Sequence, residues 1–238
     1  MKICIVIPMY NEEAIAERSL TTILQYIEKI PAFCTILVVN DGSKDKTGER
    51  VEDVIRQVGD KRKLQMIVHH KNQGYGAGIR TGVKFAIDQG YDYVVFMDSD
   101  LTDDPKYLRD MYEKMREGCD YIKTTRFASG GGYEGVPWKR RVISRLGNKF
   151  AHYVTGLPLT DFTAGYRAVR VEIFKHVTLT ENRFSLIVEE LMKARPYVKR
   201  FCEIPRVLGT RGKGSRPTSF HYTPATFWSY LKYILPRK

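Results

Sequence analysis

Short apolar runs alternate with longer amphipathic stretches through the first 125 residues of the chain. Four of the runs are nearly continuous in hydrophobic residues, as strands covered on both faces of a sheet require. The expected strands cover residues 3–7, 36–39, 65–69, 93–97 and 120–124. Helical spacing of apolar positions separates them. The expected helices cover residues 16–27, about 46–58, 77–89 and 105–117. This alternation predicts an α/β fold with a mostly parallel, doubly wound sheet flanked by helices.

The second half of the chain is less regular. A glycine-rich stretch at residues 127–138 is typical of a flexible lid. After it, the pattern predicts a basic helix at about 139–154, a turn over residues 155–167, a helix near 184–194 and a strand near 198–204.

Basic residues are concentrated in the same half. The net charge is +12, and residues 193–238 hold eleven Lys or Arg against one acidic residue, while residues 123–150 hold seven against one. Such a distribution fits a solvated surface, an anionic membrane, a phosphorylated ligand or nucleic acid. A hydrophobic content of 43% excludes a disordered or fibrous protein.

Four cysteines lie far apart, with no CxxC spacing, so neither a zinc cage nor a disulfide framework is expected. We therefore expect reduced, mostly buried thiols. The N-terminus has no signal-peptide pattern, and no apolar run approaches the ~18 residues that span a bilayer. These features favour a cytoplasmic protein.

Polar segments follow each of the first four expected strands. The carboxyl ends of parallel strands meet at one edge of a sheet and form the usual ligand site of such folds. These candidate segments cover residues 8–12, 40–47, 70–78 and 98–105.

Asp98 and Asp100 follow a buried strand at positions i and i+2. If the chain turns sharply, both carboxylates face one ligand and suit Mg²⁺ or Mn²⁺ bound to a diphosphate. Asp103 and Asp104 precede Pro105 and are better explained as helix-capping residues. Asp41 fits either a hydrogen bond to a base or ribose or an Asx turn with the following glycine.

Together, the segments "IVIPMYNEE", "VVNDGSKDKT", "NQGYGAGIRTG" and "DSDLTDDP" resemble the family 2 glycosyltransferases of the GT-A fold. The second half, through "TTRF", "RRVISRLGN", "DFTAGYRAVR" and "EIPRVLGTRGKGSR", is similar to the polyprenyl-phosphate hexose synthases, the group of dolichol-phosphate mannose synthase. The resemblance covers residues 1–216.

The resemblance implies a role for each matching residue. Those implied to bind the base and ribose are Pro8, Tyr10, Glu12, Val39 and Asp41. The DxD segment would be Asp98, Ser99 and Asp100, with Asp100 the direct metal ligand and Thr102 where the family has a glutamine that also binds metal. Arg211 and Arg216 would close over the donor diphosphate, in a loop one residue shorter than the family's. Arg126, Arg140 and Ser144 would hold the acceptor phosphate. Catalysis would rest on Asp98, Asp100, Arg126 and Arg211.

The implied activity is the inverting, Mg²⁺- or Mn²⁺-dependent transfer of mannose or glucose from GDP-mannose or UDP-glucose to a polyprenyl or dolichyl phosphate. We expect a catalytic domain over residues 1–220, with a donor half at 1–125 and an acceptor half at 126–220. Residues 221–238 would form an amphipathic segment in the lipid headgroup layer, or a helix docked on the core. The protein would be peripheral at the cytoplasmic face of the membrane. A membrane-protein partner is compatible with this placement, and we expect no nucleic-acid partner.

Two alternatives remain from the residues alone. A family 2 enzyme acting on a saccharide or other hydroxyl would need a general base, for which Asp161, Glu189 and Glu190 are candidates. A basic nucleic-acid or membrane binding module would fit the charge, but it would not need the DxD segment.

Overall fold

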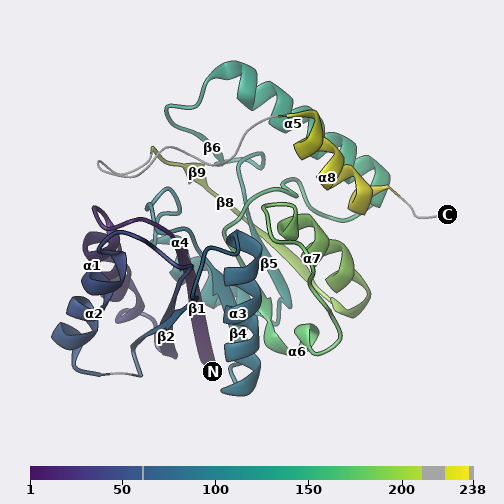
Figure 1. Ribbon diagram of the computed structural model, residues 1–238. Helices are drawn as coiled ribbons and strands as arrows, with labels where there is room; N and C mark the ends of the chain where they lie inside the picture. Colours follow the sequence, from purple (N-terminus) through teal and green to yellow (C-terminus); the bar gives the residue numbers. More distant parts are fainter. Residues whose placement is uncertain (61, 211–222, 236–238) are drawn as a thin grey trace.

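A computed structural model describes residues 1–60, 62–210 and 223–235 (Figure 1). Seven strands form one sheet in the order β3-β2-β1-β4-β7-β5-β8. They are β1 (Lys2–Met9), β2 (Phe33–Asn40), β3 (Leu64–Val68), β4 (Tyr93–Phe96), β5 (Tyr121–Thr125), β7 (Arg167–Arg170) and β8 (Phe201–Pro205). Every pairing is parallel except the two made by β7. The predicted mostly parallel sheet is confirmed.

Helices cover both faces of the sheet (Figure 1). One core cluster lies between the sheet and α1 (Ala16–Ile27), α2 (Thr47–Val58) and α4 (Tyr107–Arg116). The opposite cluster contains residues of α3 (Tyr75–Asp88), α6 (Val171–Phe174) and α7 (Leu186–Ala194). The strands between these layers are buried from both sides, which is why their sequences read as continuous apolar runs.

The second half of the chain contains elements that the sequence pattern did not predict. The expected turn over residues 155–167 leads into the antiparallel strand β7. In the first half, the helix expected over residues 105–117 is α4, which begins at Tyr107. The glycine-rich stretch is tied down by a short parallel pairing of β6 (Gly132–Tyr133) with β9 (Val207–Leu208). A 3₁₀ turn, η1 (Arg195–Tyr197), links α7 to β8.

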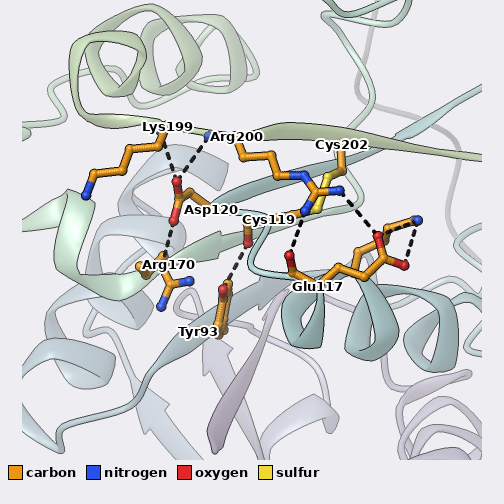
Figure 2. Close-up of a disulfide and its surroundings, with 9 residues drawn as sticks. Tyr93, Glu117, Cys119, Asp120, Arg170, Lys199, Arg200 and Cys202 are labelled. Carbon is orange, nitrogen blue, oxygen red and sulfur yellow. Dashed lines mark hydrogen bonds and ion pairs between the residues drawn. A yellow bond between two sulfur atoms is a disulfide. The ribbon is translucent and has the colours of Figure 1, made fainter.

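Two of the four cysteines form a disulfide, so the expectation of reduced thiols was wrong for this pair. Cys119 is bonded to Cys202, 83 positions along the chain, and thereby joins the start of β5 to β8 (Figure 2). The adjacent Asp120 carboxylate accepts hydrogen bonds from the backbone N–H groups of Lys199 and Arg200. Cys4 and Cys34 are buried free thiols. A sequence separation of this length gives no pairing signal.

The helices α5 (Trp138–Thr155) and α8 (Pro224–Ile234) lie side by side beyond the carboxyl ends of the strands (Figure 1). Ile234 is buried in the second core cluster, whereas Phe227 and Trp228 are exposed. Helix α8 therefore docks on the core with one face and presents aromatic side chains with the other. Within residues 1–60, 62–210 and 223–235, no helix is both long enough and apolar enough to cross a membrane.

Candidate active site

The turn after β4 brings Asp98 and Asp100 to one cavity. Leu101 adopts a left-handed backbone conformation, with φ of 59°, which costs a non-glycine residue roughly 1–2 kcal/mol. The Leu101 side chain packs against the first core cluster, which offsets this cost. The Thr102 backbone N–H and hydroxyl donate to Asp100 Oδ1 at 3.0 and 2.7 Å. The sharp turn that the DxD interpretation requires is therefore present.

A cavity of about 350 Å³ lies at the carboxyl ends of β1, β2 and β4, and we refer to it as the donor cavity. Seven of the residues that the sequence placed in donor binding line it: Pro8, Tyr10, Glu12, Asp41, Asp98, Ser99 and Asp100. Val39 is fully buried in the core and does not line the cavity.

Asp41 anchors the loop that follows β3. Its carboxylate accepts hydrogen bonds from the backbone N–H groups of Gln73 and Gly74 at 2.9 and 2.8 Å, and contacts His69 Nδ1 at 2.7 Å. The side-chain hydrogen bond that closes the turn after β2 comes instead from Asn40, whose Oδ1 accepts from the Ser43 N–H, three residues on, at 3.0 Å. Asp41 thus holds one edge of the donor cavity in place.

Seven cavity residues were given no role from the sequence. They are Met9, Asn72, Gly74, Tyr75, Asn182, Arg183 and Phe184. The first four nevertheless lie in the candidate segments 8–12 and 70–78 that follow from the strand-end rule. The other three lie in an irregular segment before α7 and carry no sequence signal. The Phe184 ring stacks on Tyr75 with a centroid separation of 5.0 Å.

A second cavity of about 600 Å³, the acceptor cavity, adjoins the first. It contains all three residues predicted to hold the acceptor phosphate, Arg126, Arg140 and Ser144. The apolar part of its wall includes Ile143, Phe150, Phe162, Phe227, Tyr230, Leu231 and Ile234. Tyr75, Asp98 and Phe184 line both cavities, so the two meet beside the DxD segment.

Arg126 is held by a buried carboxylate. Its Nε and Nη2 donate to Asp161 Oδ2 and Oδ1 at 2.6 and 2.7 Å, and Nη2 also donates to Thr163 Oγ1 at 2.8 Å. Burial alone would raise the pKa of Asp161, but the Arg126 guanidinium holds that pKa below its usual range. Asp161, a candidate general base from the sequence, is thus engaged in an ion pair.

Arg206 is a buried cation beside the DxD segment that sequence reasoning did not single out. It follows β8 directly, lines the acceptor cavity and pairs with Asp103. Burial lowers the pKa of Arg206 to about 10, and the nearby Asp98 and Asp100 favour its charged form. The second Asp103 oxygen accepts from the Asp98 N–H at 3.2 Å. The capping role expected for Asp103 was therefore wrong, whereas Asp104 does accept the Lys106 N–H at the entry to α4, at 2.9 Å.

The other candidate bases are engaged elsewhere. Glu190 is fully buried and bonded to Arg167 and to the Tyr121 hydroxyl. The Glu189 carboxylate accepts the backbone N–H groups of Thr180 and Glu181 and pairs with Lys193. Neither residue lines the donor cavity or the acceptor cavity.

Lys123 on β5 is also fully buried, and its Nζ donates to the Ala164 carbonyl at 2.6 Å. Burial lowers the pKa of Lys123 to about 7, and the neighbouring Arg167 acts in the same direction. The Ala164 carbonyl belongs to the loop that lines the acceptor cavity, so a lysine in the core braces this loop.

The carboxylate oxygens at the DxD turn fit a divalent cation that a phosphate group of a ligand also binds. Asp98 and Asp100 supply hard oxygen ligands to the same cavity. Across residues 1–60, 62–210 and 223–235, no group of three or more His, Cys, Asp or Glu side chains could enclose a metal ion. Protein carboxylates that leave several positions for substrate phosphates are typical of Mg²⁺ sites. Thr102, predicted as a second metal ligand, donates a hydrogen bond from its hydroxyl to Asp100.

Arg211 and Arg216, predicted to close over the donor diphosphate, fall outside the part of the chain that the structure describes.

The mostly parallel seven-stranded sheet with helices on both faces is an α/β fold of the GT-A type. Solved structures share it: glucosyl-3-phosphoglycerate synthase from Mycobacterium tuberculosis, solved with Mn²⁺, UDP-glucose and phosphoglyceric acid, superposes with a TM-score of 0.68 at 18% identity, over 99% of this chain and 81% of that one. The model of glycosyl transferase family 2 matches residues 4–178. The chain belongs to this family.

Three relatives act on lipid phosphates, according to their names. Polyprenol monophosphomannose synthase of Mycolicibacterium smegmatis is 30% identical over 74% of this chain and 64% of the relative. Undecaprenyl-phosphate mannosyltransferase of Micrococcus luteus is 28% identical over 92% and 88%. Dolichol-phosphate mannosyltransferase of Pyrococcus furiosus is 27% identical over 98% and 63%. The chain thus spans less than two thirds of the first and third relatives.

Proposed function

We propose that this protein transfers a hexose from a nucleoside diphosphate sugar to a polyprenyl phosphate, with inversion at the anomeric carbon and with a divalent cation at Asp98 and Asp100. The observation that carries the proposal is the junction of the two cavities at Asp98, Tyr75 and Phe184. A cavity lined by the DxD turn together with Glu12 and Asp41 suits the donor. An apolar cavity with Arg126 and Arg140 suits a lipid that ends in a phosphate.

The chemistry of the acceptor agrees with the residues present. A phosphate monoester is ionised at neutral pH, since its second pKa is near ~6, so its oxygen can attack without a general base. The bond from the anomeric carbon to the donor diphosphate breaks as the new bond to the acceptor oxygen forms, and the nucleoside diphosphate leaves. A bound cation would supply charge neutralisation for this leaving group. The protein then contributes positioning and electrostatic stabilisation, through Arg126 and Arg140 on the acceptor and Arg211 and Arg216 on the donor.

The names of the relatives support the same acceptor class, and those whose names give a sugar transfer mannose. The mycobacterial structures bind UDP or UDP-glucose with Mn²⁺, which supports a cation at the DxD turn. Mannose and glucose donors are therefore both to be tested.

An acceptor that reacts through a hydroxyl group would need a general base, and the three carboxylates expected to supply one are all engaged in ion pairs. Asp161, Glu189 and Glu190 are each bonded to a basic side chain. Glu134 is the remaining acidic side chain at the rim of the acceptor cavity, apart from Asp98. Glu134→Gln should retain at least half of the wild-type turnover, and a loss of 100-fold or more would favour a hydroxyl acceptor.

The surface around the acceptor cavity suits a membrane. Trp138, Leu146 and Tyr153 on α5 are 68%, 62% and 86% exposed, and α5 contains no acidic residue. Basic side chains lie beside them, at Lys139, Arg141, Arg145 and Lys149. Exposed aromatic residues flanked by lysine and arginine are typical of helices that lie in an anionic headgroup layer. We place the protein at the cytoplasmic membrane face as a peripheral protein, with residues 1–220 as the catalytic domain and 221–238 completing the membrane-facing segment.

Disulfides are rare in strongly reducing compartments, so the state of the Cys119–Cys202 pair tests the cytoplasmic placement. Lysis of cells in an alkylating reagent, followed by mass spectrometry, would measure the state of Cys119 and Cys202. Recovery of both as alkylated thiols would agree with the cytoplasmic placement, and recovery of the linked peptides would contradict it.

The decisive experiment is a donor screen with the purified protein. GDP-mannose and UDP-glucose are each supplied with and without Mn²⁺, and the acceptors are a short polyprenyl phosphate and the matching prenol. We expect transfer to the phosphate alone, with Mn²⁺ required. Transfer to the prenol, or to neither acceptor with any donor, would overturn the proposal.

A further inference from the structure

One wall of the donor cavity is an irregular segment, Thr180–Ser185, which we call the wall segment. It lies between α6 and α7, and its residues Asn182, Arg183 and Phe184 line the donor cavity. Phe184 also lines the acceptor cavity and stacks on Tyr75. The position of this segment therefore sets the width of the donor cavity.

Helices α3 and α7 hold the wall segment from two sides. The Gly76 N–H at the start of α3 donates to the Asn182 carbonyl at 2.9 Å, and Arg80 donates to the Glu181 carbonyl and to Asn182. A Cβ atom on Gly76 would lie 2.1 Å from the Glu181 carbonyl oxygen, so only glycine permits this approach. The Glu189 carboxylate on α7 accepts the Thr180 and Glu181 N–H groups at 3.0 and 2.8 Å.

The third contact comes from the C-terminal helix. The Glu181 side chain receives hydrogen bonds from Lys232 and from the Tyr233 hydroxyl, the latter at 2.8 Å, and from Ser185 Oγ at 2.8 Å. Burial would raise the pKa of Glu181, but Lys232, Tyr233 and Ser185 together hold that pKa below its usual value. Glu181 is thus charged near neutral pH and links α8 to the wall segment.

The same helix lines the acceptor cavity with other side chains. Phe227, Tyr230, Leu231 and Ile234 belong to the wall of that cavity, whereas Lys232 and Tyr233 point to Glu181. Helix α8 is short, and ten of its eleven residues are at least partly accessible to solvent. It therefore lines the acceptor cavity directly and contacts the wall segment through Glu181, with few buried residues to fix it when the acceptor cavity is empty.

We propose that Glu181 is a positioning residue through which α8 holds the wall of the donor cavity, so that a lipid phosphate bound in the acceptor cavity increases the affinity for the donor nucleotide. The assignment of the two ligands rests on the proposed function. A lipid chain packed against Phe227 and Leu231 stabilises the seated position of α8. Lys232 and Tyr233 then hold Glu181, and the wall segment stays closed on the nucleotide. Because coupling between two binding sites is reciprocal, the nucleotide should increase lipid affinity by the same factor.

Calorimetry on the whole protein tests the coupling without turnover. The titrants are GDP and UDP in the presence of Mn²⁺, and the detergent solution contains either a short-chain prenyl phosphate or the matching prenol. For the wild-type protein we expect the prenyl phosphate to lower the Kd of the better nucleotide by roughly 5-fold or more, the usual lower range of such effects. The prenol, which lacks the phosphate, controls for the effect of the lipid chain on the detergent micelle.

Three variants separate coupling from folding. The double variant Lys232→Met with Tyr233→Phe should bind the nucleotide and the lipid, but the lipid effect on the Kd should fall below 2-fold. Lys232→Arg keeps a cation at Glu181 and should restore the effect. Lys175→Met removes an ion pair of similar type with Glu172 on α6, away from both cavities, and should leave the effect unchanged.

The possible failures are distinguishable. If the wild-type protein transfers sugar but its nucleotide Kd does not respond to the lipid, the coupling is refuted and the proposed function stands. If the double variant responds to the lipid as the wild type does, Glu181 is not the link. If no nucleotide binds and no sugar is transferred, both proposals are refuted.

Discussion

Arg126 and Asp161 form a two-point ion pair, with Nε to Oδ2 at 2.6 Å and Nη2 to Oδ1 at 2.7 Å, in which the carboxylate is fully buried. The pair places a guanidinium at the wall of the acceptor cavity and fixes its orientation. An Arg126 variant should therefore lose activity for two separate reasons. The fold is less stable because Asp161 is left unpaired, and the acceptor phosphate lacks its cation.

Arg126→Met should destabilise the protein by about 3–5 kcal/mol, because it leaves a buried carboxylate unpaired. The double variant Arg126→Met with Asp161→Asn should recover much of that stability and yet remain inactive, because the acceptor phosphate still lacks its cation. Urea denaturation and a transfer assay measure the two effects. Equal activity in the double variant and the wild type would show that Arg126 does not bind the acceptor phosphate.

Asp100→Asn should lower turnover by at least ~100-fold, because the charge that would hold the cation and the donor diphosphate is lost. The amide oxygen can still accept the Thr102 hydrogen bonds, so the turn should persist. Titration of UDP or GDP should become insensitive to Mn²⁺. The matched control is Asp104→Asn, in the same acidic run but outside both cavities, which should retain the Mn²⁺ effect.

The buried Lys123 predicts a specific pH dependence of stability. Its pKa is about 7 in the folded protein and has the ordinary value of 10.5 in the unfolded chain. Between these values the unfolded chain binds more protons, so the free energy of unfolding should rise with pH, by at most ~1.4 kcal/mol per pH unit from this group. Below pH 7 the lysine is charged in both states, and its contribution no longer changes.

Lys123→Met removes this dependence and leaves all other titrating groups in place. The stability difference between the wild type and the variant should therefore change steadily across pH 7 to 10, as measured by urea denaturation in a series of buffers. A difference that stays constant across this range would show that Lys123 titrates normally.

Trp138 and Trp228 are both about two-thirds exposed, on α5 and α8 respectively. Trp138→Ser with Trp228→Ser should weaken sedimentation with anionic vesicles by at least about tenfold, because each large apolar side chain contributes roughly 1.5–3 kcal/mol when buried. Added salt should weaken binding of the wild type as well. Tyr197→Ser is the control, since Tyr197 is an exposed aromatic residue on η1, outside both helices. Equal sedimentation of all three proteins would place the membrane contact elsewhere.

Much of the sheet and of the DxD site could be predicted because both depend on local sequence. Buried parallel strands are continuous apolar runs, and the residues after them share one edge. Strand β7 was missed because "RAVR" carries two arginines, and its burial depends on distant partners, Glu190 for Arg167 and Asp120 for Arg170. Asn182, Arg183 and Phe184 reach the donor cavity only because the wall segment packs on α3. No local pattern contains that contact.

The disulfide between Cys119 and Cys202 closes residues 119–202 into a covalent ring with two tails. Every described residue that we assign to the acceptor phosphate lies within the ring, while the DxD turn lies in the tail before it. In the chain-entropy account, closing a loop of this length restricts the unfolded chain by about 4–5 kcal/mol. A single proteolytic cut within residues 120–201 would therefore open the ring without releasing a fragment, until a reductant separates the two pieces.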